Sequence, residues 1–149
     1  MNEIEELRYL ILAVQREGNR MLAAGLRPLG LTPAQGEALG LLADREPLSL
    51  NGLGELLVCE SGTSPSRIVD RLVGAGLVLR ETDPADRRHV LLSLTPEGRK
   101  LAKRVRGVEA SLHQALTERI GGRPIAPTVR LLRALAADSP SGQALARRK

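Results

Sequence analysis

The sequence feature that most constrains the fold is a capped helix followed at once by a hairpin and then by a second capped helix. The first helix is predicted to start near residue 64, the hairpin to occupy residues 77–94, and the second helix to follow residue 95. A helix joined directly to a short hairpin cannot bury a core alone, so the chain around it must supply the remaining layers.

Local chemistry sets the limits of these elements. Ser64 is a favourable cap, and Pro65 fits the first turn of a helix, where no amide donor is needed. Gly74 and Gly76 end the helix. Two strands are predicted over Leu77–Thr82 and His89–Leu94, joined by turn residues 83–86.

The rest of the chain is predicted to be helical. Asn2 and Glu5 form a capping-box pair for a helix over Glu3–Leu26, and residues 32–35 start a second helix in the same way. A short, glycine-containing helix is expected at Asn51–Val58. After the hairpin, a long helix from Thr95 ends at the break 121–124, and a final helix covers Ala126–Ala137.

The core of this chain has to be aliphatic. Among 149 residues there is no Phe or Trp, and Tyr9 is the only aromatic residue. Leucine-rich cores favour helix bundles, because leucine loses little side-chain freedom in a helix. The long opening helix is too apolar to stand alone, and it packs either on its own domain or on a second copy of the chain.

We therefore predict a mainly α (α+β) fold, a winged helix-turn-helix with a two-stranded wing, flanked by long N- and C-terminal dimerisation helices. Residues 1–149 form one domain. Within it, residues 33–100 form the DNA-binding lobe, residues 1–30 and 101–137 the helical dimerisation region, and residues 138–149 a frayed tail.

The excess of positive charge begins where the helix and hairpin lie. The net charge is +5, yet residues 1–59 carry five Arg and eight Asp or Glu, a net −3. Residues 60–106 carry ten Lys or Arg and six Asp or Glu, a net +4, and residues 107–149 a further +4. A basic excess that begins at one motif is typical of an electrostatic footprint on phosphates.

The helix after residue 64 offers the residues of a recognition helix. Its exposed start carries small hydroxyl groups and an arginine, and free amides at a helix N-terminus suit phosphate. The predicted contacts with DNA on this side are Ser61, Thr63, Ser64, Ser66, Arg67 and Arg71. The alternative for residues 61–66 is a simple capping loop, and Asp70 and Arg71 are also expected to form ion pairs that orient the helix.

The hairpin tip supplies a second contact. Asp86 and Arg88 lie two residues apart on a strand and so point the same way, and the carboxylate can hold the guanidinium forward. Arginine fits the narrow minor groove of A·T-rich DNA. Arg87 faces the other way, towards phosphate or a surface acid. The alternative is a solvated salt bridge that stabilises little.

These motifs resemble those of the MarR family of bacterial transcription regulators. The resemblance rests on Ser66-Arg67-Ile68-Val69-Asp70-Arg71-Leu72, Gly76-Leu77-Val78, Asp83-Pro84-Ala85-Asp86-Arg87-Arg88 and Leu94-Thr95-Pro96-Glu97-Gly98-Arg99, within residues 53–101. It implies a homodimer built from the first and last helices that often represses genes from a palindromic operator. It also implies base contacts at Ser64, Ser66 and Arg67, a wing in the minor groove at Asp86 and Arg88, and release by a small molecule or an oxidant.

Other chemistry is poorly supported by the sequence. Cys59 allows no internal disulfide, and the alternatives for it are plain packing and oxidant sensing. His89 and His113 lack neighbours at metal-ligand spacing, and no nucleophile or nucleotide-binding motif is present, so we expect no cofactor, no metal and no enzyme activity. No apolar run approaches the roughly 20 residues of a membrane span, and no signal peptide is apparent, so a cytoplasmic protein is expected.

The function predicted from the sequence is sequence-specific binding of double-stranded DNA by a homodimeric repressor, released by a small-molecule effector. The alternative is a winged-helix protein-interaction module without specific DNA binding.

Overall fold

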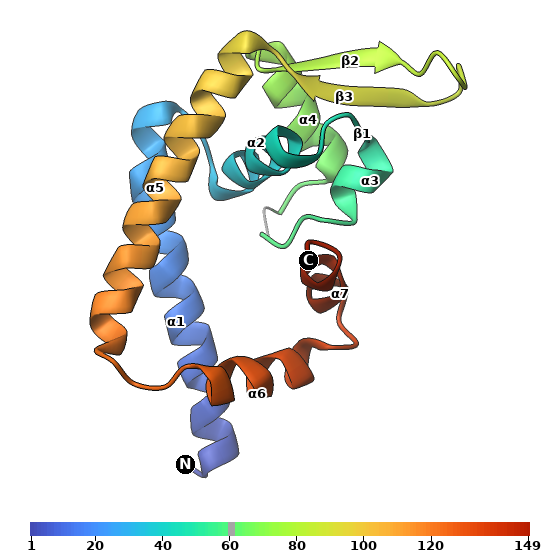
Figure 1. The fold of residues 1–149 in the computed structure, drawn as a ribbon. Helices are drawn as coiled ribbons and strands as arrows, with labels where there is room; N and C mark the ends of the chain where they lie inside the picture. The colour runs from blue at the N-terminus through green and yellow to red at the C-terminus, as the bar shows by residue number, and fades with distance from the viewer. Residues whose placement is uncertain (60–61) are drawn as a thin grey trace.

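Two long helices run side by side and carry a smaller lobe at one end (Figure 1). They are α1, Glu3–Leu26, and α5, Pro96–Ile120, in this computed structural model, which describes residues 1–59 and 62–149. Gly25 lets α1 approach α5 closely, since a Cβ there would collide with the side chain of Val108. A short 3-10 turn, η1 (Arg27–Leu29), ends at Gly30 in the left-handed region and redirects the chain into the lobe.

The lobe is built from short elements in the order α2, β1, α3, α4, β2, β3. Their bounds are α2 Pro33–Arg45, β1 Leu48–Ser49, α3 Leu50–Gly54, α4 Pro65–Gly74, β2 Val78–Thr82 and β3 Val90–Leu94. The sheet is antiparallel with strand order β1-β3-β2, and Val78 pairs with Leu94 and Thr82 with Val90. The predicted helix-turn-helix and wing are confirmed, within a mostly helical fold.

The starts of α1, α2, α4 and α5 are those predicted from the sequence. Asn2 and Glu5 form a reciprocal capping box at α1, and Thr32 and Gln35 do the same at α2. Ser64 caps α4 with Pro65 in the first turn, and Thr95 caps α5. These caps satisfy amides that have no partner inside the helix.

Two details of the lobe differ from prediction. The sheet has a third strand, β1, which pairs Leu48 with Leu92 and is too short to show an alternating pattern in the sequence. The helix expected at Asn51–Val58 ends at Gly54, so the segment up to Cys59 is a turn. Glycine is a weak helix former, and the amides of Val58 and Cys59 bond to a side chain of α2 instead of continuing the helix.

The core is aliphatic, as the composition predicts. Its fully buried side chains come from α1, α2, α3, α4, both long strands and α5: Leu26, Leu39, Leu42, Leu53, Val69, Leu72, Val78, Leu92 and Val105. Each such side chain contributes about 1.5–3 kcal/mol by leaving water. The core lies in the lobe and in the adjoining half of α1 and α5, so it fixes the lobe to the long helices.

The frayed tail predicted for residues 138–149 is wrong. After α6, Ala126–Ala136, the chain forms a seventh helix, α7, Pro140–Ala146, which Ser139 caps. Ala144 is buried, and the Arg148 guanidinium donates to the carbonyl oxygen of Leu56 at 2.9 Å. Arg147 and Arg148 of this tail donate to backbone carbonyls of the lobe, and those partners lie 92 residues away in the sequence.

A close contact between α5 and the turn after α4 gives a test of this packing. Gly98 lies against the backbone carbonyl of Leu77, where a Cβ would overlap that oxygen, and the Thr95 hydroxyl donates to the Gly76 carbonyl at 2.7 Å. We expect Gly98→Ala to lower the free energy of unfolding by about 2 kcal/mol or more, because backbone cannot move aside as a side chain can.

Gly107→Ala is the matched control. Gly107 lies in the same helix with open space around its Cα, so alanine there should stabilise by up to about 1 kcal/mol. Urea unfolding of both variants checks the pair, and equal stabilities for the two would contradict the close contact.

Candidate nucleic-acid interface

The first turn of α4 presents polar side chains to solvent. Ser64 accepts the amide of Arg67 at 3.4 Å, while Ser66 and Arg67 are exposed. The opposite face of the helix is buried through Ile68, Val69 and Leu72. A helix with one buried stripe and one polar stripe is fixed in rotation about its axis, so the exposed residues face solvent in one defined direction.

Arg71 extends this polar face. It lies four residues after Arg67, so the two arginines are neighbours on the same side of α4, and both are exposed. Thr63, just before the helix, is half-buried and lines a small cavity of about 170 Å³ together with Arg71. Ser61 lies outside the described residues.

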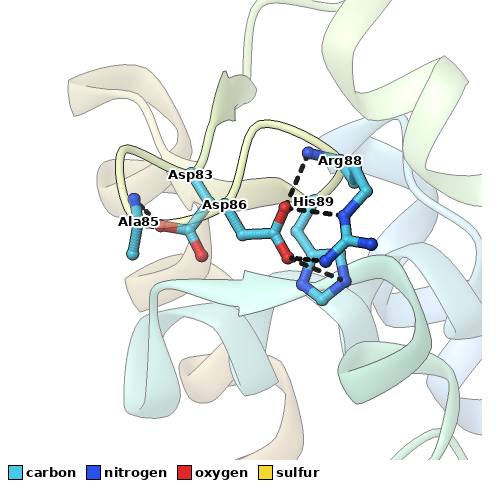
Figure 2. A network of polar contacts seen from close by, with 5 residues as sticks. All are labelled: Asp83, Ala85, Asp86, Arg88 and His89. Carbon is cyan, nitrogen blue, oxygen red and sulfur yellow. Dashed lines mark hydrogen bonds and ion pairs between the residues drawn. The ribbon is translucent and has the colours of Figure 1, made fainter.

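The wing tip holds Arg88 in a fixed orientation. The Asp86 carboxylate accepts from the Arg88 guanidinium through both oxygens, with Nε–Oδ1 at 3.1 Å and Nη2–Oδ2 at 3.0 Å, and also from the Arg88 amide at 3.1 Å. Figure 2 shows this network, with Asp83 binding the amide of Ala85 in the same turn. The predicted pairing of Asp86 with Arg88 is confirmed, but the two residues lie in the turn before β3 and not on a strand, so hydrogen bonds within the turn bring them together.

The charges at the tip follow from this contact. Hydrogen bonds from the Arg88 side chain, and then from its backbone, hold the pKa of the Asp86 carboxyl below its usual range. The carboxylate is therefore ionised at neutral pH, and the pairing is lost only as the pH falls through that lowered pKa. The Arg88 side chain is 86% exposed, so one face of the guanidinium remains open to a ligand.

An ion pair connects the helix to the wing. Asp70, on the exposed side of α4, pairs with Arg80 on β2. The sequence predicted that Asp70 forms an ion pair without indicating its partner. Because α4 also packs on β2 through the core, the exposed turn of α4 and the wing belong to one rigid body.

Three further arginines of the α4 and wing surface have no ion-pair partner among the described residues, so their charge is not neutralised there. Within residues 1–59 and 62–149, the side chains of Arg67, Arg71 and Arg87 form no ion pair or side-chain hydrogen bond. All three are exposed. The surface thus offers unneutralised positive charge both on the helix and beside Arg88, which suits a polyanion.

Comparison with known proteins identifies this arrangement. The model of the MarR family matches residues 31–90. The multiple antibiotic resistance protein MarR of Escherichia coli K12 is 33% identical over 133 residues, which cover 89% of this chain and 92% of that protein. The chain belongs to the MarR family. It is accordingly a DNA-binding transcription regulator, and the relatives named here are regulators rather than enzymes.

Solved structures agree with this assignment. A crystal structure of mutant MarR from E. coli complexed with operator DNA is 32% identical and has a TM-score of 0.77, covering 90% of this chain and 96% of that chain. BpsR of Bordetella bronchiseptica, whose DNA binding is regulated by 6-hydroxynicotinic acid, is 26% identical with a TM-score of 0.74, covering 93% and 96%.

The described part of this MarR-family chain has neither a metal-binding cluster nor a membrane-spanning helix. The described residues contain no cluster of three or more His, Cys, Asp or Glu side chains that could hold a metal ion. Across the same residues, none of the helices combines the length and apolar character that crossing a bilayer requires.

Two residues at the lobe were missed by sequence reasoning. Glu37 and Arg148 meet beside the turn after α3, although they are 111 positions apart. Glu37 follows the buried Gly36 and precedes the buried Ala38, a carboxylate inside an otherwise apolar stretch. That placement could have indicated a partnered acid, but nothing local names the partner.

Cys59 lies in that same turn, and its chemistry bears on oxidant sensing. The residue is half-buried, and burial raises the pKa of its thiol to about 12, with the nearby Glu37 carboxylate adding to the effect. The thiolate, which is the reactive form, is therefore scarce at neutral pH. This favours plain packing over oxidant sensing.

We expect folded protein to react with iodoacetamide at pH 8 roughly a hundredfold more slowly than the same chain in urea, because unfolding restores an ordinary thiol pKa. Mass spectrometry of the alkylated Cys59 over time measures both rates. Comparable rates in the two states would contradict the raised pKa and would remove this argument against oxidant sensing by Cys59.

Proposed function

We propose that this chain is a homodimeric repressor that reads a palindromic operator with α4 and its β2–β3 wing, and that a small-molecule effector releases it. The observation that carries the proposal is the Asp86–Arg88 fork, held on the same rigid lobe as the exposed turn of α4. A fixed, exposed guanidinium beside a polar helix start suits simultaneous contact with a minor and a major groove.

The helix is assigned to base and phosphate contacts. Ser64, Ser66 and Arg67 would face base edges, since arginine is the commonest specific partner of guanine. Thr63 and Arg71 flank that turn and suit phosphate contacts, and we assign Ser61 to the same group.

The wing is assigned to the minor groove through Arg88, with Asp86 orienting it. Arg87, which is exposed and forms no ion pair with any residue that the structure describes, suits a phosphate. Together these contacts would give one lobe a helix in one groove and an arginine in the next.

Exposed apolar side chains on α1 and α6 favour a homodimer, in which a second copy of the chain would cover them. In α1 the side chains of Ile4 and Val14 are 76% and 65% exposed, and in α6 that of Leu135 is 60% exposed. Single chains rarely leave such helical stripes in water. Pairing α1 and α6 across a two-fold axis would bury them and place two α4 helices roughly 34–36 Å apart, one turn of DNA.

Control by a small molecule is supported by the relationship to BpsR, whose DNA binding 6-hydroxynicotinic acid regulates. A ligand that binds one arrangement of the two lobes better would change their spacing and shift the population away from the DNA-bound form. We place this protein in the cytoplasm, where a bacterial regulator meets DNA, and its effector would act there. We assign no enzyme activity to the protein.

If the wing enters the minor groove through Arg88, substituting Arg88 and Arg87 should affect DNA affinity in different ways. We expect Arg88→Ala to weaken operator binding roughly tenfold or more, because a minor-groove contact is lost. Arg87→Ala removes the same charge one residue away and should weaken all duplexes alike, with a smaller salt slope. Gel shifts at several salt concentrations measure both, and an Arg88→Ala affinity equal to that of the parent would remove the wing from the mechanism.

Selection of bound duplexes from random DNA tests the function itself. The parent chain should enrich an inverted repeat with half-sites about one helical turn apart. Arg67→Ala should bind with a weaker base preference in each half-site while keeping most of its nonspecific affinity. Weak, sequence-blind binding by the parent, with little salt dependence, would instead favour the protein-interaction module.

A further inference from the structure

A single carboxylate of α2 holds the turn that leads from α3 to the recognition helix. Glu37 Oε1 accepts hydrogen bonds from the backbone amides of Val58 and Cys59, each at 2.9 Å. These amides follow the end of α3 and precede α4 in the chain. One side chain therefore satisfies two backbone donors of the turn that no helix or strand could pair.

The second-last residue of the chain completes this arrangement. Arg148 Nη2 donates to the other oxygen of Glu37 at 2.7 Å, and Arg148 Nε and Nη2 donate to the carbonyl of Leu56 at 2.9 and 2.6 Å. Glu37 is only 11% exposed and Arg148 26%. Charge-assisted hydrogen bonds this sheltered from water are stronger than those of a surface ion pair.

The turn that carries Arg148, directly after α7, is itself anchored. Arg147 donates to the carbonyl of Glu55 at 3.2 Å, and Arg45 donates to the carbonyl of Arg148 at 2.7 Å. At the other end of α7, Gly142 sits against the carbonyl of Ala136, so closely that a Cβ would overlap it. Figure 1 shows the result, with the C-terminus returning to the lobe beside α3.

We propose that Glu37 and Arg148 are positioning residues for DNA recognition: together they clamp the turn after α3, and this clamp adds to the core packing of α4 in holding the orientation in which α4 is presented to DNA. Neither side chain belongs to the exposed surface assigned to bases and phosphates. The clamp acts on Leu56, Val58 and Cys59, whose backbone connects the two helices of the motif. The inference rests on the proposed function, because an orientation matters only if α4 reads sequence.

The experiment uses the full chain and four variants. Arg148→Gln and Glu37→Ala each remove one half of the clamp, and Arg148→Lys keeps the charge without the planar fork. Lys149→Gln is the matched control, because it removes the same charge from the neighbouring residue. For each, we would measure affinity for the duplex that the parent selects from random DNA and for an unrelated duplex of equal length.

Hydrogen exchange at the Val58 and Cys59 amides, recorded without DNA, reports on the clamp directly. We expect Glu37→Ala to speed exchange at both amides roughly tenfold or more, since their acceptor is gone. Arg148→Gln should lower the ratio of operator affinity to unrelated-duplex affinity roughly tenfold. Arg148→Lys should lower this ratio by less, and Lys149→Gln should leave it unchanged. Sedimentation and thermal unfolding establish that each variant remains a folded protein of the parent's oligomeric state.

Two results would overturn the proposal. In the first, amide exchange is faster in Glu37→Ala, but the ratio of operator to unrelated-duplex affinity in both Glu37→Ala and Arg148→Gln equals that of the parent; the pair would then be purely structural. In the second, the amides of Val58 and Cys59 exchange in Glu37→Ala at the same rate as in the parent. If the parent itself bound all duplexes alike, the proposed function and the positioning role would fail together, while the exchange data would still show separately whether the clamp exists.

Discussion

The burial of one face of α4 is the constraint on which the rest of this structure depends. Ile68, Val69 and Leu72 pack into a core shared with α2, β2 and α5, and this leaves the other face of the helix in water. Turning α4 about its axis would expose apolar side chains at about 1.5–3 kcal/mol each. The polar residues of α4 are therefore held in place by side chains that never meet a ligand.

Arginines in and beside the lobe differ in whether they are paired. Arg80 and Arg148, for example, have carboxylate partners and connect parts of the fold, α4 to β2 and the turn after α7 to α2. Arg67, Arg71 and Arg87 are exposed and form no ion pair within the described residues. Arg88 is intermediate, because its pairing with Asp86 orients it while leaving most of its surface open. Charge that stabilises the fold and charge that is free to bind a polyanion are thus carried by different side chains.

The long helices and the lobe are joined by close contacts along the chain and by the residues that follow α7. Gly25 and Gly98 permit close approaches that a side chain would block, the first between α1 and α5 and the second between α5 and the turn after α4. At the C-terminus, α7 returns to the lobe through Arg147 and Arg148. If α1 and α6 pair with a second copy as proposed, a change in that packing would reach α4 through these contacts.

The sequence by itself determined the elements whose signals are local. Caps at Asn2, Thr32, Ser64 and Thr95 act within three residues, so these helix starts could be predicted, and Asp86 and Arg88 are only two positions apart in the turn of the hairpin. The aliphatic composition likewise indicated a helical fold with a leucine core. Only the tertiary structure decided the partners that lie far apart in the chain. The short strand β1, the link between Asp70 and Arg80, the docked helix α7 and the Glu37–Arg148 clamp all depend on which segments the core brings together, and that contact map is a property of the packed chain rather than of any stretch of it.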